Sequence, residues 1–124
     1  MGQRKVATFE SAPASVRAAR EFVGDALDAW HLDRVRDVAS LCTSEVATNA
    51  VRHAGTPFRL TVEARASEVV IEVEDRDEDE PVSRLPDLDA ESGRGLWMVT
   101  AMASRWGYQK VHHGKVVWFS LSLS

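Results

Sequence analysis

A glutamate, an asparagine and a histidine stand four residues apart in the segment 44–54, which reads Ser-Glu-Val-Ala-Thr-Asn-Ala-Val-Arg-His-Ala. At about 100° per residue, Glu45, Asn49 and His53 fall within roughly 80° of one another on a helix. Burying a carboxylate or an amide without partners costs about 2–7 kcal/mol, so protein groups, water or a ligand must satisfy them. The helix is therefore a candidate wall of a site. The same arc carries three apolar residues, Val38, Cys42 and Val46.

The types of these side chains indicate what the site could do. Asn49 offers a neutral oxygen that can help hold Mg²⁺ against phosphates, and Glu45 offers a base toward a hydroxyl or water. A buried Glu–Asn pair satisfied within the protein is the structural alternative. For His53 the alternative is packing or capping at the helix end.

Two further polar features lie at the rims of apolar surfaces. Asp75 ends an alternating apolar row, where it could accept a hydrogen bond from an amine or form a structural ion pair. Gly93-Arg94-Gly95 opens a helix, and a helix N-terminus flanked by glycines suits an anion such as phosphate. The alternative for the glycines is a simple joint between loop and helix.

Hydrophobic periodicity predicts the elements that position these residues: a strand, two helices, two strands, a long loop, a helix and two strands. Pro13 suits a helix start, Asp33 is a candidate N-cap, and Gly55 and Pro57 should end the second helix. The expected strands are 6–10, 58–66, 69–75, 108–112 and 116–123, and the expected helices are 13–30, 33–53 and 92–106.

This order of elements predicts an α+β fold, a two-layer sandwich of a mostly antiparallel sheet with three helices on one face. A chain of 124 residues is about one domain, so residues 1–124 are taken as a single unit. The segment 77–92 has two prolines, few apolar residues and no sustained periodicity, and is predicted to be a mobile lid loop.

Composition narrows the functional classes. No apolar run approaches the roughly 18 residues that span a bilayer, so we expect a cytoplasmic protein without membrane contact. Ten acidic residues against two basic ones lie between Glu72 and Glu91, which argues against a broad nucleic-acid surface. Cys42 is the only cysteine and is predicted to lie in the core.

Taken in order, Glu45-x3-Asn49-Ala-x2-His53, Asp75 and Gly93-Arg-Gly95-Leu96 resemble the motifs of the GHKL (Bergerat-fold) ATP-binding domains. Within these, the chain looks most like the stand-alone anti-sigma-factor serine kinases, including small actinobacterial members. Trp106-Gly107 and Val117 to Phe119 add to this resemblance, which covers residues 5 to 123.

The resemblance implies a role for each matching residue. Asn49 would coordinate Mg²⁺ bridging the phosphates of ATP, Glu45 would orient or deprotonate the attacking hydroxyl, and Asp75 would accept from the adenine amino group. The remaining implied ATP-binding residues, by phosphate contact or by position in the motif, are Arg52, His53, Gly93, Arg94, Gly95 and Leu96. The implied activity is that of a protein serine kinase that phosphorylates an anti-anti-sigma partner and sequesters a sigma factor. The implied assembly is a homodimer.

The segment Asp75-Arg-Asp-Glu-Asp79 departs from the family pattern, because Asp77 and Asp79 stand where the family has glycines. Aspartate adds bulk and repels phosphate unless a cation intervenes. This favours a second hypothesis, a degenerate module that regulates transcription by protein binding without catalysis. A third is a detached catalytic half that acts on a histidine in trans.

Overall fold

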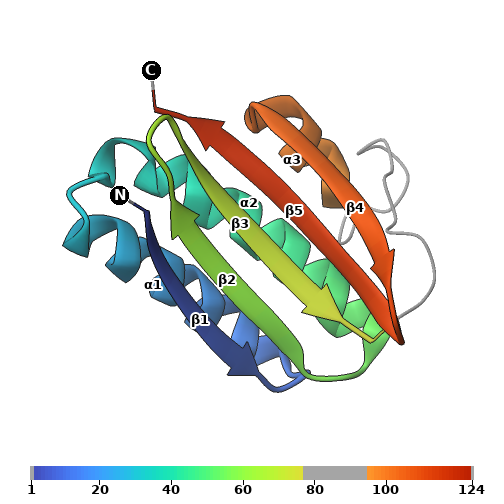
Figure 1. The fold of residues 1–124 in the computed structure, drawn as a ribbon. Helices are drawn as coiled ribbons and strands as arrows, with labels where there is room; N and C mark the ends of the chain where they lie inside the picture. The colour runs from blue at the N-terminus through green and yellow to red at the C-terminus, as the bar shows by residue number, and fades with distance from the viewer. Residues whose placement is uncertain (1, 77–94, 124) are drawn as a thin grey trace.

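The computed structural model describes residues 2–76 and 95–123, which form a five-stranded antiparallel sheet with helices packed on one face (Figure 1). This confirms the predicted two-layer α+β sandwich. The sheet order is β1-β2-β3-β5-β4. The strands are β1 (Gln3–Phe9), β2 (Phe58–Ala64), β3 (Glu68–Asp75), β4 (Arg105–Val111) and β5 (Gly114–Ser122). The helices are α1 (Pro13–Ala29), α2 (Arg36–Asn49) and α3 (Gly95–Met102), with a 3₁₀ turn η1 (Asp33–Val35) and a π turn η2 (Ala50–Ala54).

Helix α1 begins at Pro13, whose fixed φ suits a first helical turn, and it follows the predicted span. Arg20 interrupts the apolar spacing in sequence but is exposed. The helix packs along α2, and its fully buried residues are Ala19, Val23, Gly24, Ala26 and Leu27.

Both ends of α2 differ from the expected helix. Asp33 does not cap it, because residues from Asp33 form the 3₁₀ turn and the N-cap position is Val35, without a side-chain hydrogen bond. After Asn49 the backbone widens into η2, and Gly55 then ends the helical path with a φ of 66°. A left-handed glycine after the last turn is a common helix stop.

The sheet turns one row of each strand toward the helices. On β2 these are Phe58, Leu60 and Val62, and on β3 they are Val69, Ile71 and Val73, all almost inaccessible to water. Asp75 continues the β3 row and is itself buried. Alternation in the sequence therefore predicted the inward face correctly, including its charged end.

Helix α3 is shorter than expected, because Trp106 and Gly107 belong to β4 and do not close the helix. Trp106 pairs with Phe119 of β5 and packs half-buried against the core. Its spacing from Val99 fitted a helix, but Trp106 and Tyr108 also alternate, and an aromatic side chain suits a pleated, half-buried surface. No helix in the described ranges is long and apolar enough to cross a membrane.

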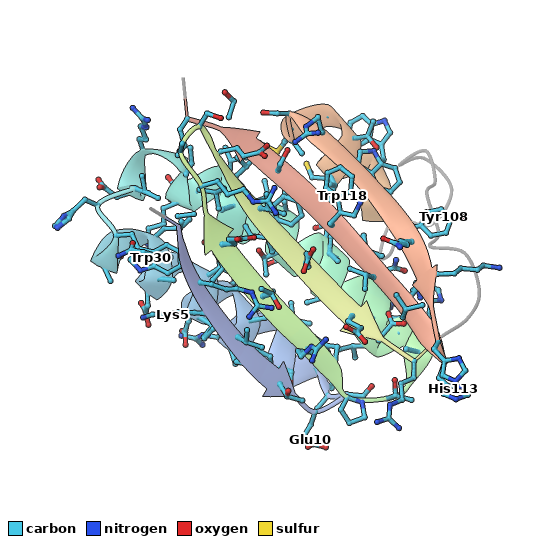
Figure 2. The ribbon with its side chains drawn as sticks, viewed as in Figure 1. Lys5, Glu10, Trp30, Tyr108, His113 and Trp118 are labelled. Carbon is cyan, nitrogen blue, oxygen red and sulfur yellow. The ribbon has the colours of Figure 1, made fainter. Side chains whose placement is uncertain are left out.

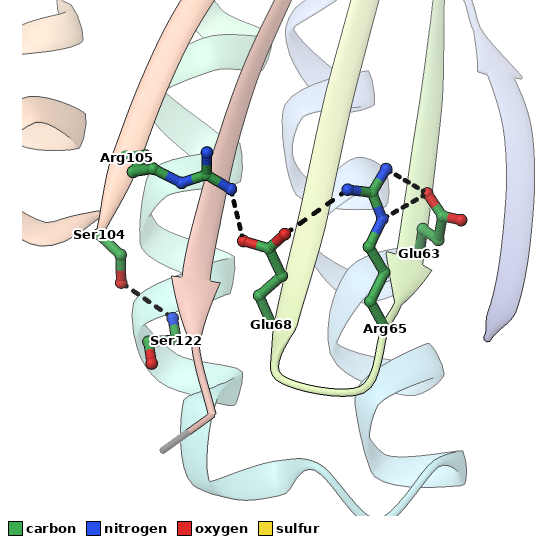
Figure 3. Close-up of polar contacts among 6 residues, drawn as sticks. All are labelled: Glu63, Arg65, Glu68, Ser104, Arg105 and Ser122. Carbon is green, nitrogen blue, oxygen red and sulfur yellow. Dashed lines mark hydrogen bonds and ion pairs between the residues drawn. The ribbon is translucent and has the colours of Figure 1, made fainter. Parts of the chain in front are cut away.

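The sheet face away from the helices carries charged side chains that pair across strands (Figure 3). Oε1 of Glu68 on β3 lies 2.8 Å from Nη2 of Arg105 on β4, and its Oε2 lies 3.5 Å from Nη1 of Arg65. Nη2 of Arg65 lies 3.1 Å from Oε1 of Glu63 on β2. The hydrogen bond from Arg105 lowers the pKa of Glu68. Trp118 lies on this face of β5, with the Arg105 guanidinium 5.7 Å from its ring centroid (Figure 2).

Candidate functional site

The second half of α2 supplies one wall of the site. Asn49, its last residue, is 8% exposed, and its side-chain amide makes no hydrogen bond to any of the residues that the structure describes. Glu45, one turn earlier, is half-buried. Its amide atoms are not among the fully buried side-chain atoms that lack a partner in the described part of the chain, so the amide is open to water or a ligand through this small exposed surface.

The wider π turn separates the third polar residue from these two. Arg52 and His53 both lie in η2 and are exposed, whereas Asn49 is buried. A π turn winds more residues into each turn, so later side chains no longer follow the α-helical arc. The expectation that Glu45, Asn49 and His53 share one buried face is wrong for His53.

Cys42 lies on the same helix, α2, and is fully buried as predicted. Burial raises the pKa of its thiol to about 11, and the negative charge of Glu45 adds to the shift. The Glu45 carboxylate is therefore close enough to influence the buried side of α2. A neutral thiol at this position can act as core packing but not as a nucleophile.

Asp75 forms a buried ion pair at the end of β3. Its Oδ1 lies 3.2 Å from Nζ of Lys115, and each side chain is only 3% exposed. The pairing follows from register, because Asp75 and Lys115 are direct partners on β3 and β5. Of the two interpretations of Asp75, the structural ion pair is present, with lysine as the cation.

Lys115 was not predicted as a site residue, although the sequence pattern of β5 indicates its position. The inward row Val117, Phe119 and Leu121 of β5, extended backward by one step, arrives at Lys115. Lys115 at this end of the β5 row has the charge opposite to that of Asp75 at the end of the β3 row. Two opposite charges that terminate neighbouring apolar rows are a pattern for a buried cross-strand pair.

Two contacts hold the end of β3 against its neighbours. A Cβ at Gly114 would lie 2.0 Å from the Asp75 carbonyl oxygen, so only glycine permits this approach of β5. On the other side, the Arg76 amide donates to Thr56 Oγ1 at 3.3 Å, which ties the chain after η2 to the end of β3. Asp75 is thus fixed relative to both the hairpin and the end of the α2 segment.

A comparison with protein-family models matches residues 9–121 to the histidine kinase-like ATPase domain. The match includes α2, Asp75 and the start of α3. The chain belongs to this family. Membership in an ATPase family implies a nucleotide site, and the buried Asn49 amide is a suitable oxygen ligand for a metal that also binds phosphates.

The fold of this histidine kinase-like ATPase domain is also found in a solved structure. It is similar to the crystal structure of the RsbU and RsbW domains of Rv1364c from Mycobacterium tuberculosis, with a TM-score of 0.73 and 18% sequence identity. The similarity covers 96% of this chain and 32% of that one, so this chain spans about a third of its length. A comparison with curated proteins gave no match.

The segment that the sequence predicts to bind the phosphates is described only in part. Helix α3 begins at Gly95 and packs against α2, which agrees with a helix start at the glycine pair. Gly93, Arg94, the predicted lid 77–92 and the two aspartates at 77 and 79 lie outside the described residues. Leu96 lies in the first turn of α3.

The metal chemistry of the site is limited by the side chains present. In the described part of the chain, no three His, Cys, Asp or Glu side chains gather as a ready-made metal site. Mg²⁺ is commonly held by one or two protein oxygens together with substrate phosphates. Asn49 fits that mode, in which the metal arrives with the nucleotide.

Proposed function

We propose that this domain binds ATP with Mg²⁺ and transfers the γ-phosphoryl group to a serine of a partner protein. One observation carries the proposal: Asn49 is a buried amide at the end of α2 without a hydrogen-bond partner among the described residues. The family match supports the nucleotide. Magnesium bound between Asn49 and the phosphates would supply charge stabilisation for the transfer.

Each site residue has a distinct part in this proposal. Glu45 orients the serine hydroxyl and takes its proton as the hydroxyl oxygen bonds to the γ-phosphorus and the bond to the β-phosphate oxygen breaks, which releases ADP. Asp75 accepts from the adenine amino group. Backbone N–H groups around Gly93 and Gly95 hold the phosphates, and Arg52 or Arg94 adds positive charge.

The partners we propose are an anti-anti-sigma protein, as the phosphorylated substrate, and a sigma factor that the domain sequesters. The support is the resemblance of the sequence motifs to anti-sigma-factor serine kinases and the shared fold with a structure that contains an RsbW domain. The same resemblance supports a homodimer in the cytoplasm.

The test of catalysis compares two site variants with two controls on the same elements. Glu45→Gln should lower the rate of phosphotransfer roughly 10²- to 10⁴-fold, because it removes the base. Asn49→Ala should abolish binding of Mg²⁺-ATP, because it removes the metal ligand. Thr48→Ala on α2 and Glu72→Gln on β3 should leave both activities near those of the unmodified chain.

The substrate for this assay comes from a pull-down in native lysate, with and without ATP, followed by mapping of phosphorylated residues. We expect a phosphoserine on a small bound protein. Full phosphotransfer in both site variants would refute the proposed mechanism. Acid-labile phosphate on the partner would instead support the transfer to histidine in trans.

A second candidate is a non-catalytic module that binds a protein partner and regulates transcription. The buried Asp75–Lys115 ion pair favours it, because the carboxylate expected to bind the base already has a strong partner. The aspartates at positions 77 and 79 favour it as well. Titration calorimetry with ATP, ADP and Mg²⁺ separates the candidates, because only the non-catalytic module is compatible with no heat of binding at millimolar nucleotide.

A further inference from the structure

A cavity of about 470 Å³ lies where β1, β2 and β3 meet the turn between β4 and β5. Its floor includes Thr8, Arg59 and Glu74, which are partners in register across three strands. The chain neighbours Phe58 and Val73 are buried on the helix side of the sheet, so the alternating floor residues point to the opposite side. The cavity is therefore separated by the sheet from the proposed nucleotide site on α2.

Backbone contacts hold two walls of the cavity in place. A Cβ at Gly114 would lie 2.0 Å from the Asp75 carbonyl oxygen and 2.9 Å from Cα of Arg76, so the β4–β5 turn lies directly against the end of β3. Asp75 also lines the cavity, but its carboxylate pairs with Lys115 in the inward row. The amide of Arg76 donates to Thr56 Oγ1 at 3.3 Å. The cavity is thus organised before any ligand binds, which lowers the cost of binding.

Charged and titratable side chains face the cavity from every element that lines it. Glu74 of β3 is the acid on its floor, and its Oε1 lies 2.6 Å from Nη2 of Arg59 on β2, which offsets its charge. Arg76 adds an exposed guanidinium, a fork of donors that matches an oxyanion. His112 and His113 of the turn are both exposed and complete the wall (Figure 2).

The two histidines of the turn lie unusually close together. Their ring centroids are 3.9 Å apart, and His113 has a φ of 71°, a conformation that glycine or asparagine adopts more readily. A protonated imidazole has two N–H donors, but two charged rings at this separation repel each other. An anion beside both rings would offset that repulsion, so anion binding and proton uptake by the pair favour each other.

We infer that this cavity binds a phosphate-type oxyanion, held by the Arg76 guanidinium and the imidazoles of His112 and His113. The ligand is either inorganic phosphate or the phosphoserine side chain of a protein, since both present the same oxygens. Hydrogen bonds between ionised donors and phosphate oxygens are about twice as strong as those between neutral groups. The inference is independent of the proposed nucleotide binding, because no residue of that site takes part.

The first experiment titrates the chain with sulfate at constant ionic strength, followed by the ring C–H signals of its four histidines in NMR spectra. Sulfate remains a dianion between pH 6 and pH 8, so a change in affinity reports on the protein. The signals of His112 and His113 should shift saturably, with about ten-fold higher affinity at pH 6 than at pH 8. The signal of His31, which follows α1, should stay constant.

Three variants test the assigned contacts. Arg76→Gln should lower the affinity for sulfate at pH 6 about ten-fold, the usual effect of a lost hydrogen bond to a charged group. Arg17→Gln, which changes an exposed arginine on α1, is the matched control and should bind as the unmodified chain does. His113→Asn should remove most of the pH dependence, since asparagine accepts the left-handed backbone but carries no imidazole.

A comparison of inorganic phosphate with a short phosphoserine peptide at pH 7 distinguishes the two sources. Tighter binding of the peptide identifies a phosphorylated protein as the ligand, and equal or weaker binding identifies free phosphate. Either result supports the site if Arg76→Gln weakens it. The inference is overturned if sulfate causes no saturable shift, if Arg76→Gln binds as well as the control, or if His53 shifts in place of the turn pair.

Discussion

Single side chains in the α2 segment show how burial sets chemical behaviour. Cys42 and Asn49 are both buried, but one is an apolar thiol surrounded by core residues and the other is an amide without a partner among the described residues. The thiol contributes packing, whereas the amide, at 8% exposure, remains open to water or a ligand. Sequence spacing placed both correctly on the inward side of the helix.

Cys42 should be almost unreactive in the folded protein. Raising its pKa from 9.0 to about 11 lowers the thiolate fraction at pH 8 about 100-fold, and burial restricts access further. A thiol-specific reagent at pH 8 should therefore react slowly with the native chain and rapidly in denaturant. Since the chain has one cysteine, the signal comes from this residue alone.

The same shift predicts an alkaline dependence of stability. A thiol whose pKa is raised on folding stabilises the native state below the unfolded value, and this contribution is lost as the pH rises from about 9 toward 11. The free energy of unfolding of Cys42→Ala should fall less over this range than that of the unmodified chain. Fast reaction of Cys42 with the thiol-specific reagent in the native chain at pH 8 would contradict the raised pKa on which both predictions depend.

The β3 and β5 strands position Asp75 and Lys115 through their close contact. Their register brings Asp75 opposite Lys115, and Gly114 permits the contact of the strand ends. His113, which has a φ of 71°, lies in the turn of the hairpin that joins β4 to β5 (Figure 2). The geometry of the ion pair thus depends on a turn and a glycine as much as on the two charged residues.

Gly114→Ala should destabilise the domain by about 3 kcal/mol, because its Cβ would overlap a backbone carbonyl that cannot move without displacing Asp75. Gly55→Ala is the matched control: its φ of 66° is unfavourable for alanine, but nothing lies within 4 Å of the added Cβ. The control should lose only about 1 kcal/mol. Chemical denaturation measures both, and equal losses would show that the contact at Gly114 is not restrictive.

Across the whole molecule, the helices cover one sheet face, while on the other charged side chains connect strands that are distant in sequence (Figures 1 and 3). Glu68 is central to this network, since it contacts both Arg65 and Arg105. Exposed ion pairs contribute little individually, but a network that spans three strands makes stability depend on pH and salt.

Glu68→Gln should lower the melting temperature at pH 7, and the difference from the unmodified chain should narrow as the pH falls toward 3. The pKa of Glu68 is lowered on folding by Arg105, so its stabilisation is present above the unfolded value and lost as the pH falls through the folded one. Arg105→Gln should reproduce the narrowing, because it removes the stronger partner. A constant difference at all pH values would contradict the assigned cause.

The sequence by itself determined the inward and outward faces of the strands, the span of α1, the two-layer α+β class and the polar positions on α2 and β3. These features depend on local periodicity, which each segment carries independently of its neighbours. The same locality explains the errors at Asp33, His53 and Trp106, where helical and extended patterns compete within a few residues.

Only the tertiary structure decided that Lys115 meets Asp75, that Gly114 must remain a glycine and that His53 leaves the buried face of α2. Residues 75 and 115 are forty positions apart, and their contact depends on the register of two strands joined through a helix and a hairpin. Register is set by the combined packing of all five strands and the helices behind them. No pattern within one segment contains that information.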